Sequence, residues 1–216
     1  KFIRSRSFDY CMNIKFIEKP DITQARTWNY LLQSSLQAEP DSTKARLAYE
    51  LIAYVVCRNT TAEKAVILYG DSGSGKSLMC SLIESAFSPQ DVTAFDLKYL
   101  GSKTWSIKFK NISVAICREI PTKALSSIDI LKSVITCEKI TGEEKYAISE
   151  SFVPHCKLVM AGNTLPNFSE VDDTGNRSLI RRFVVLPFEK THTDMDIDLG
   201  LKKRLINERD IIFSYA

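Results

Sequence analysis

The segment VILYGDSGSGKS, at residues 66–77, constrains the fold of this chain more than any other. Its apolar start predicts a buried strand, and the pattern G-x-x-x-x-G-K-S begins directly afterwards at Gly70. The glycines allow a tight loop with inward-pointing N–H groups, and a helix beginning at Lys76 directs its positive N-terminus to the same point. A strand, loop and helix in this order are typical of a site that binds the phosphates of a nucleoside triphosphate.

Individual roles follow from the chemistry of this motif. Lys76 is expected to reach the β- and γ-phosphates, and the hydroxyl group of Ser77 to ligate Mg²⁺. The whole predicted nucleotide site comprises Gly70, Asp71, Ser72, Gly73, Ser74, Gly75, Lys76, Ser77 and Leu78. The motif does not indicate which process hydrolysis would drive.

Composition places the chain among ordinary globular proteins. Its 216 residues are 44% apolar and 25% charged, and no apolar run approaches the length needed to span a membrane. The net charge of +3 does not by itself indicate nucleic-acid binding, so local charge has to decide that question. The six cysteines form no C-x-x-C pair, and we expect buried free thiols in a reducing compartment. The sequence starts at Lys1, and we interpret it as part of a longer chain.

Alternating apolar runs and amphipathic segments predict an α/β fold. Further strands are expected at residues 92–96, 112–117, 157–161 and 184–188, and further helices at residues 76–87 and 124–135. This alternation predicts a mostly parallel, five-stranded sheet between helices. A hairpin is expected at residues 139–149, turning at residues 141–144, and a helix at residues 201–216.

Two helices are expected before the first strand of the sheet. Asp21 is a candidate N-cap with Gln24 in the capping-box position, and Asp41 or Ser42 would start the second helix. We predict that residues 1–60 form an arm and a helical collar segment, and that residues 61–216 form the nucleotide-binding domain.

Polar residues follow two of the predicted strands, where a nucleotide hydrolase holds its catalytic groups. Glu119, after the strand ISVAIC, could orient water or hold Mg²⁺, whereas Arg118 stands where many such enzymes have a second acid. With Glu119 alone, Ser77 and water would supply most of the Mg²⁺ coordination. Asn163, after LVMAG, could contact the attacking water or the γ-phosphate, although Asn is also a common turn residue.

Two arginines, Arg181 and Arg182, precede the last predicted strand, FVVLPF. An arginine directed at the γ-phosphate stabilises the charge of the transition state, often from a neighbouring subunit. The alternative is a solvated basic pair at the start of an edge strand.

Together these motifs resemble the superfamily 3 helicases, a branch of the AAA+ ATPases, and most of all the ATPase domain of phage, plasmid and poxvirus primase–helicases. The resemblance runs from about residue 28 to residue 216. It rests on the lead-in WNYLL and LAYELIAYVV, on ICREIP as Walker B, on LKSVITCEKITGEEKY, on LVMAGNTLP as sensor 1, and on NRSLIRRFVVLPF and LKKRLINERDIIFSYA. It implies ATP and Mg²⁺ as ligands, with Glu119 as the Walker B acid, Asn163 as the sensor and Arg182 as the arginine finger.

The resemblance also implies a homohexameric ring that translocates single-stranded DNA in the 3′-to-5′ direction at a replication fork. The expected location is the cytoplasm, that of a host cell if the source is a virus or phage, and a primase domain could precede this segment. In the family, the hairpin before sensor 1 contacts DNA, and here its best candidates are Lys145 and Tyr146. Residues 98–110 are a second candidate, because aromatic residues alternate there with basic ones such as Lys103 and Lys108.

Two other functions are compatible with the same motifs. One is an AAA+ ATPase that remodels or loads replication proteins without unwinding DNA. The other is a nucleotide-dependent assembly scaffold. Stimulation of ATP hydrolysis by single-stranded DNA distinguishes the helicase from both.

Overall fold

A five-stranded parallel sheet forms the centre of the computed structural model, which describes residues 12–57, 59–122, 128–144, 146–167, 173–192, 198 and 200–216. The strands lie in the order β2-β3-β6-β1-β7, and each pairs in parallel with its neighbours. Their bounds are β1 (Ala65–Gly70), β2 (Val92–Ala94), β3 (Val114–Cys117), β6 (Lys157–Gly162) and β7 (Phe183–Phe188). The predicted α/β fold with a parallel five-stranded sheet is therefore confirmed.

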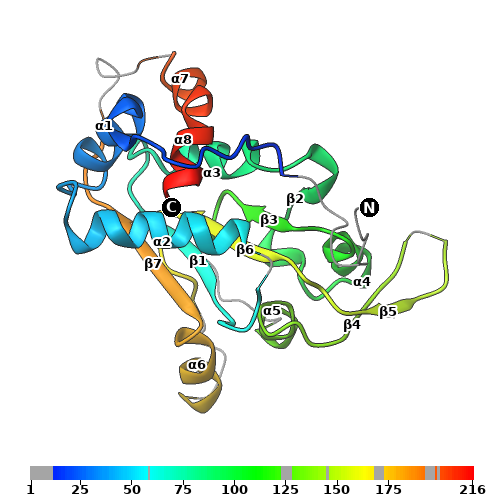
Figure 1. Ribbon diagram of the computed structural model, residues 1–216. Coiled ribbons are helices and arrows are strands. Elements are labelled where there is room, and N and C mark those ends of the chain that lie inside the picture. The colour runs from blue at the N-terminus through cyan, green and yellow to red at the C-terminus, as the bar shows by residue number, and fades with distance from the viewer. Residues whose placement is uncertain are drawn as a thin grey trace, which may run out of the picture.

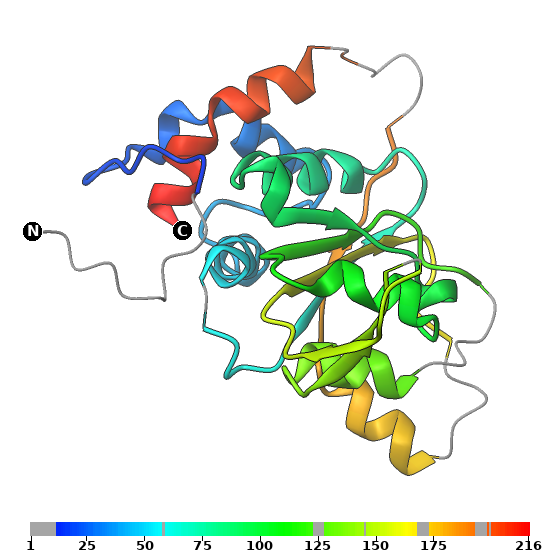
Figure 2. The ribbon, with the colours of Figure 1, turned by 90° about the vertical axis from the view of Figure 1, so that its right-hand side faces the viewer.

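Both faces of this sheet are covered, as the apolar composition of its strands requires. Along β1, Val66 and Leu68 belong to one hydrophobic cluster, whereas Ala65 and Ile67 belong to a second cluster on the opposite face. This alternation is the period of two expected of a strand. Figure 2 shows the sheet between two groups of helices, so the fold has three layers.

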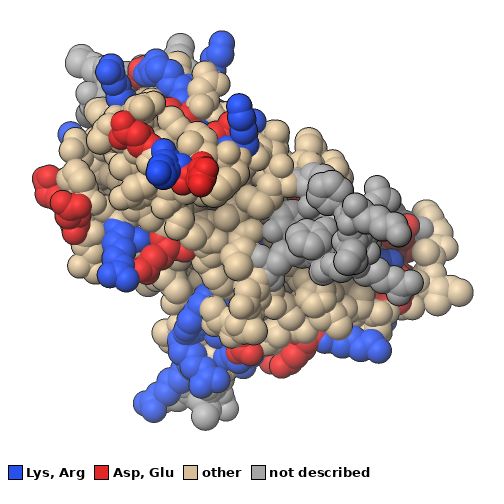
Figure 3. Space-filling model, viewed as in Figure 1, with Lys and Arg blue, Asp and Glu red and all other residues tan. Residues whose placement is uncertain are grey.

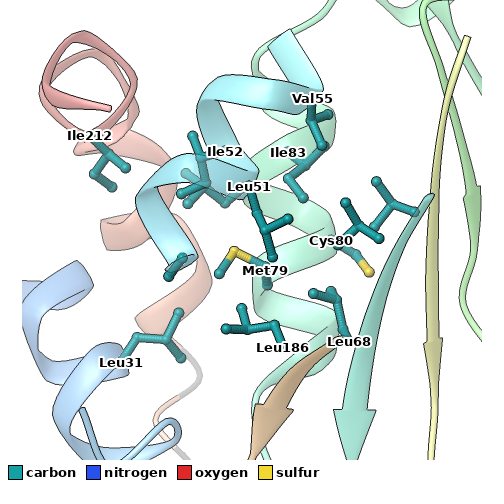
Figure 4. Packing of buried hydrophobic residues seen from close by; sticks show 14 of the residues in the cluster. Leu31, Leu51, Ile52, Val55, Leu68, Met79, Cys80, Ile83, Leu186 and Ile212 are labelled. Atoms are coloured by element: carbon teal, nitrogen blue, oxygen red, sulfur yellow. The ribbon is translucent and has the colours of Figure 1, made fainter. Parts of the chain in front are cut away.

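The first layer contains the helix of the phosphate loop and the two ends of the described chain. It comprises α1 (Arg26–Ser34), α2 (Thr43–Val56), α3 (Lys76–Ser85), α7 (Leu201–Asn207) and α8 (Arg209–Tyr215). Met79 and Ile83 of α3 pack toward Leu51 and Ile52 of α2, with Ile212 of α8 close by (Figure 4). The buried residues of α1 and α2 belong to the same cluster as those of β1 and α3, so this collar segment is anchored directly on the sheet.

The second layer covers the opposite face with shorter elements. It comprises the 3-10 turns η3 (Leu97–Tyr99) and η4 (Ile107–Phe109), with α4 (Lys103–Ser106), α5 (Ile128–Ile135) and α6 (Asp173–Ile180). Leu131 and Val134 of α5 are fully buried against the sheet, and the first residues of the helix predicted at 124–135 lie partly outside the described residues. A further 3-10 turn, η2 (Pro89–Asp91), connects α3 to β2.

The predicted hairpin is present, but its turn lies elsewhere. Strands β4 (Ile140–Gly142) and β5 (Glu150–Phe152) pair antiparallel, with Gly142 opposite Glu150, so the connection spans residues 143–149 rather than turning at residues 141–144. Gly142 is the last residue of β4, and the position requires glycine because a Cβ atom there would lie 2.7 Å from the backbone of Ile107. The hairpin projects from the body of the molecule beside α4 (Figure 1).

The helix predicted to start at Asp21 is interrupted. Asp21 does cap a turn, but that turn is the 3-10 segment η1 (Ile22–Gln24), and α1 begins only at Arg26. The C-terminal helix is also divided, at Glu208, into α7 and α8. The backbone of Ala25, with ψ of 65°, separates η1 from α1. The Glu208 carboxylate, from the α7–α8 junction, caps α1 by accepting hydrogen bonds from the backbone N–H groups of Thr27 and Trp28.

The second expected helix and the free cysteines are largely confirmed. Ser42 caps α2 by accepting a hydrogen bond from the Ala45 N–H group. The described cysteines are free thiols, and Cys80, Cys117 and Cys156 are buried, but Cys57 is exposed because it lies just past the end of α2. None of the described helices has both the length and the apolar character that crossing a membrane requires.

Candidate functional site

The loop between β1 and α3 has the backbone that its glycines predict. Gly73 and Gly75 adopt left-handed conformations, with φ of 77° and 100°, which residues with a Cβ atom rarely accept. Gly75 is also the N-cap of α3, and a Cβ atom there would lie 2.9 Å from Oγ of Ser35. The loop is therefore closed tightly over the N-terminus of α3, the end of a helix that attracts anions.

Lys76 lies inside this loop. Its side chain is largely buried, and Nζ donates hydrogen bonds to the carbonyl oxygens of Gly70 and Asp71, each at 2.6 Å, and to Oγ of Ser74 at 3.3 Å. Burial lowers the pKa of Lys76. Its ammonium group is thus hydrogen-bonded to the phosphate loop itself. Phosphate oxygens of a bound nucleotide would replace these two carbonyl oxygens.

A pocket of about 540 Å³ opens beside the loop and gathers most of the predicted site. Because β1, β3 and β6 are parallel neighbours, the residues that follow them meet at one edge of the sheet. The pocket is lined by Ser72, Gly73, Ser74, Gly75, Lys76, Ser77, Leu78, Arg118, Glu119, Ile120, Thr122, Gly162, Asn163 and Thr164. The structure therefore brings Lys76, Ser77, Glu119 and Asn163 together around one space, as the sequence predicts.

The donors around this pocket fit a Mg²⁺ ion that is bound together with a phosphate ligand. Ser77 and Glu119 are both exposed to the pocket. Within the described part of the chain, His, Cys, Asp and Glu side chains form no group of three or more that could hold a metal ion. Mg²⁺ in nucleotide enzymes needs no such group, because one or two protein ligands, water and the phosphates complete its coordination.

Arg118 is the unexpected member of the pocket lining. Its Nη2 atom lies 2.6 Å from Oε2 of Glu84, at the far end of α3, and both side chains are partly exposed. The positive charge of Arg118 thus lies next to Glu119 in the sequence, and it is paired with Glu84 in an ion pair that water can reach.

A second pocket, of about 640 Å³, lies on the other side of the phosphate loop. It is lined by Arg26, Thr27, Tyr30, Leu31, Ser35, Gly73, Gly75, Leu78, His192, Asp198, Leu201, Lys202, Arg204 and Glu208. Most of these residues were not predicted from the sequence. They come from α1 and α7, which meet through the contact of Glu208 with α1 across 181 positions, and no local pattern indicates such a contact. His192 connects the lining of this pocket to the phosphate loop. Its backbone N–H group donates a hydrogen bond to the Gly73 carbonyl oxygen, and its ring atom Nε2 lies 3.0 Å from Oγ of Ser35.

Arg182 does not reach this site in its own chain. It precedes β7, and Phe183 pairs with Ala65, whereas the phosphate loop leaves the opposite end of β1 beside Phe188. Six residues of strand separate the two edges by about 20 Å. The guanidinium group contacts Glu63 at 3.6 Å and donates to the Ser178 carbonyl.

Other basic residues surround Arg182 at this edge. Arg177 and Arg181 are exposed, and Lys64 donates to the carbonyl oxygen of Arg181 at 2.6 Å. Figure 3 shows basic side chains gathered at the lower end of the molecule, where Figure 1 places α6. This positive edge is available to an anionic partner outside the chain.

The two candidate DNA-binding segments form one continuous surface. The Glu143 N–H group donates to the Lys103 carbonyl at 3.0 Å, and Lys110 forms an ion pair with Glu150 at 2.5 Å. At the hairpin end Tyr146 is fully exposed, whereas Lys145 lies outside the described residues.

Aromatic and basic side chains are stacked on this surface. The rings of Tyr99 and Trp105 lie 5.0 Å apart and nearly parallel, with an interplanar angle of 20°. Nζ of Lys98 lies 5.0 Å from the Tyr99 ring centroid, and Nζ of Lys108 lies 3.5 Å from that of Trp105. The stack holds two ammonium groups at the surface. That of Lys98 is also paired with Asp96 at 2.8 Å, and that of Lys108 can bind phosphate.

Comparison with known proteins identifies a family and similar solved structures. The model of DUF5906, described as a family of unknown function, matches residues 68–182.

Among solved structures, an apo form of the C-terminal region of NrS-1 is 19% identical with a TM-score of 0.65, covering 94% of this chain and 46% of that one. A second apo structure of that region is 16% identical with a TM-score of 0.66, covering 93% and 46%. This chain thus spans about half the length of those chains. The search of curated proteins found no match.

Proposed function

The chain belongs to the family of unknown function DUF5906, and from its phosphate site we propose that it is the ATP-hydrolysing motor of a superfamily 3 DNA helicase. One observation carries this proposal: Lys76, Ser77, Glu119 and Asn163 line a single pocket around the phosphate loop. These residue types at the ends of adjacent parallel strands are the groups that hydrolysis of a nucleoside triphosphate requires.

Each group has a role that its chemistry supports. Lys76 and the N–H groups of the loop bind the β- and γ-phosphates, and Ser77 with Glu119 would hold Mg²⁺, which neutralises phosphate charge when bound. Glu119 also accepts a hydrogen bond from the attacking water and orients it toward the γ-phosphate. Asn163 donates its amide protons to the γ-phosphate or to that water.

The nucleoside occupies the second pocket in this proposal. That pocket shares Gly73, Gly75 and Leu78 with the first, so it lies next to the same phosphate loop. Its volume of about 640 Å³ is in the range of small-molecule sites, and Tyr30 and Leu201 give it the apolar surface that a base needs. We expect adenine and ribose between α1, α3 and α7.

The role in DNA replication rests on similarity of fold. The structures reported above are of the C-terminal region of NrS-1, and together with the sequence motifs the shared fold supports a replication-related, helicase-like role. We propose that the chain assembles into a homohexamer, that single-stranded DNA is its substrate, and that the full-length protein carries a primase domain.

The surface formed by η3, α4, η4 and the β4–β5 hairpin is the proposed DNA contact. It presents the ammonium groups of Lys98 and Lys108 on an aromatic stack, and the exposed ring of Tyr146 at the hairpin end. Ammonium groups suit the phosphates of single-stranded DNA, and exposed rings suit its bases.

The proposal is tested by measuring ATP hydrolysis with and without single-stranded DNA, together with the mass of the protein with ATP and Mg²⁺. A helicase motor predicts hydrolysis, stimulation by DNA and a nucleotide-dependent hexamer. Hydrolysis that DNA leaves unchanged would point to a remodelling ATPase. Assembly with nucleotide but without hydrolysis in either condition would point to a scaffold.

A further inference from the structure

Arg118 is the charged residue of the phosphate pocket to which the motif assigns no role. It follows β3 directly, and it lines the same pocket as Lys76, Ser77 and Glu119. In many nucleotide hydrolases an acid occupies this position and assists Mg²⁺ coordination, whereas Arg118 would repel the metal ion. A guanidinium group at this position is suited instead to the phosphate oxygens, which it can contact through two parallel N–H groups.

The present partner of Arg118 lies along α3. Lys76, Cys80 and Glu84 are spaced four residues apart, so they share one face of this helix. Nη2 of Arg118 lies 2.6 Å from Oε2 of Glu84, and the charge of Arg118 opposes the burial that raises the pKa of Cys80 to about 11. The guanidinium group therefore lies beside the face of α3 that begins at Lys76.

The contact with Glu84 is one that a stronger anion can replace. The side chain of Arg118 is 44% exposed and that of Glu84 35% exposed, so water screens the pair and it contributes little to stability. A nucleoside triphosphate brings several negative charges into the pocket that Arg118 already lines. Both Arg118 and Glu84 are on the surface, so the exchange needs rotation of a side chain and no change in the core.

We propose that Arg118 binds the γ-phosphate of the ATP in its own subunit and leaves Glu84 when it does so. This inference rests on the proposed nucleotide-binding function and adds a γ-phosphate sensor to it. ADP lacks the group that Arg118 contacts, so with ADP the ion pair with Glu84 remains. The position of Arg118 thus reports, at the end of α3, whether hydrolysis has occurred.

The test compares the dissociation constants of ADP and of the non-hydrolysable analogue AMP-PNP, both with Mg²⁺, in four proteins: wild type, Arg118→Ala, Glu84→Gln and Lys76→Ala. We expect Arg118→Ala to weaken AMP-PNP binding by about tenfold to a hundredfold, the usual effect of losing a charged hydrogen bond, and to leave ADP binding within about threefold. Glu84→Gln breaks the same ion pair but frees Arg118, so its AMP-PNP binding should equal or exceed that of wild type.

Other outcomes separate the two proposals. If Arg118→Ala and Glu84→Gln weaken ADP and AMP-PNP alike, Arg118 only ties β3 to α3 and the inference is wrong. If Arg118→Ala binds both nucleotides as wild type does while Lys76→Ala binds neither, the inference again fails but the nucleotide site stands. If wild type binds neither nucleotide, the proposed function fails with it. Unchanged melting temperatures of the variants exclude misfolding as the cause of any loss.

Discussion

Arg182 and Lys76 lie at opposite ends of the strands of one sheet. Arg182 precedes β7, which pairs there with the start of β1, and Lys76 lies beyond the end of β1. About 20 Å of strand lies between the two ends. If ATP binds as proposed, an arginine in this place does not reach the nucleotide of its own subunit, whereas in the proposed ring it can face that of a neighbour.

The first prediction follows from this separation. Arg182→Ala and Lys76→Ala should each be nearly inactive, since an arginine supplied by a neighbour contributes about 10³ to 10⁵ in rate. Mixed in one ring, the two variants should partly restore ATP hydrolysis, because random mixing leaves about a quarter of the interfaces with both residues. Steady-state hydrolysis of the co-assembled chains is the measurement.

The same mixing experiment identifies the arginine that acts. Arg182 contacts Glu63 and is mostly buried, whereas Arg177 and Arg181 are exposed. If mixed rings form but no activity returns, Arg182 is not the residue that crosses the interface. Mixing Lys76→Ala with Arg181→Ala, and then with Arg177→Ala, would show which of the two replaces it.

The second prediction concerns the aromatic and basic surface beside the hairpin. Lys108→Ala removes the ammonium group that lies 3.5 Å from the Trp105 ring centroid, and should weaken the binding of single-stranded DNA. If Lys108 contacts a phosphate, the slope of log affinity against log salt should decrease by about 0.7. The measurement is a salt titration of binding, with Lys203→Ala on α7 as the matched control. An unchanged slope for Lys108→Ala would move the contact to Lys145 or Lys103.

The third prediction concerns the helix cap that joins the two ends of the chain. Glu208 accepts three hydrogen bonds, from the N–H groups of Thr27 and Trp28 and from the Thr27 hydroxyl group. Glu208→Ala leaves these donors without their partner and should lower the free energy of unfolding by about 1–3 kcal/mol in urea titrations. Glu50→Ala, which removes only an exposed pair with Arg46, should cost less than about 0.5 kcal/mol. Equal losses would mean that Glu208 is not a cap of this strength.

The central part of the site could be predicted from the sequence because its signals are local. The glycine spacing, Lys76 and Ser77 lie in one short segment, and Glu119 and Asn163 each follow an apolar strand. Parallel strands bring such ends to one edge, so the pocket follows from the expected sheet.

The rest depends on contacts between distant parts of the chain. Glu208 caps α1 from 180 positions away and lines the second pocket. Gly142 is the last residue of β4 and not part of the turn, and the packing of Ile107 against it is a contact that no local turn signal shows. The partner of Arg118, Glu84, is likewise set by the packing of α3 against the sheet.

The most direct test of ATP hydrolysis at this site is a paired measurement of ATP binding and ATP turnover in wild type and Glu119→Gln. The substitution keeps the size of the side chain and removes the negative charge that accepts a hydrogen bond from water. We expect ATP to bind both proteins with similar affinity, and turnover to decrease by about 10² to 10⁴ in Glu119→Gln. Equal turnover in the two proteins would contradict the assignment of Glu119, and absence of turnover in wild type with single-stranded DNA present would contradict the proposed function.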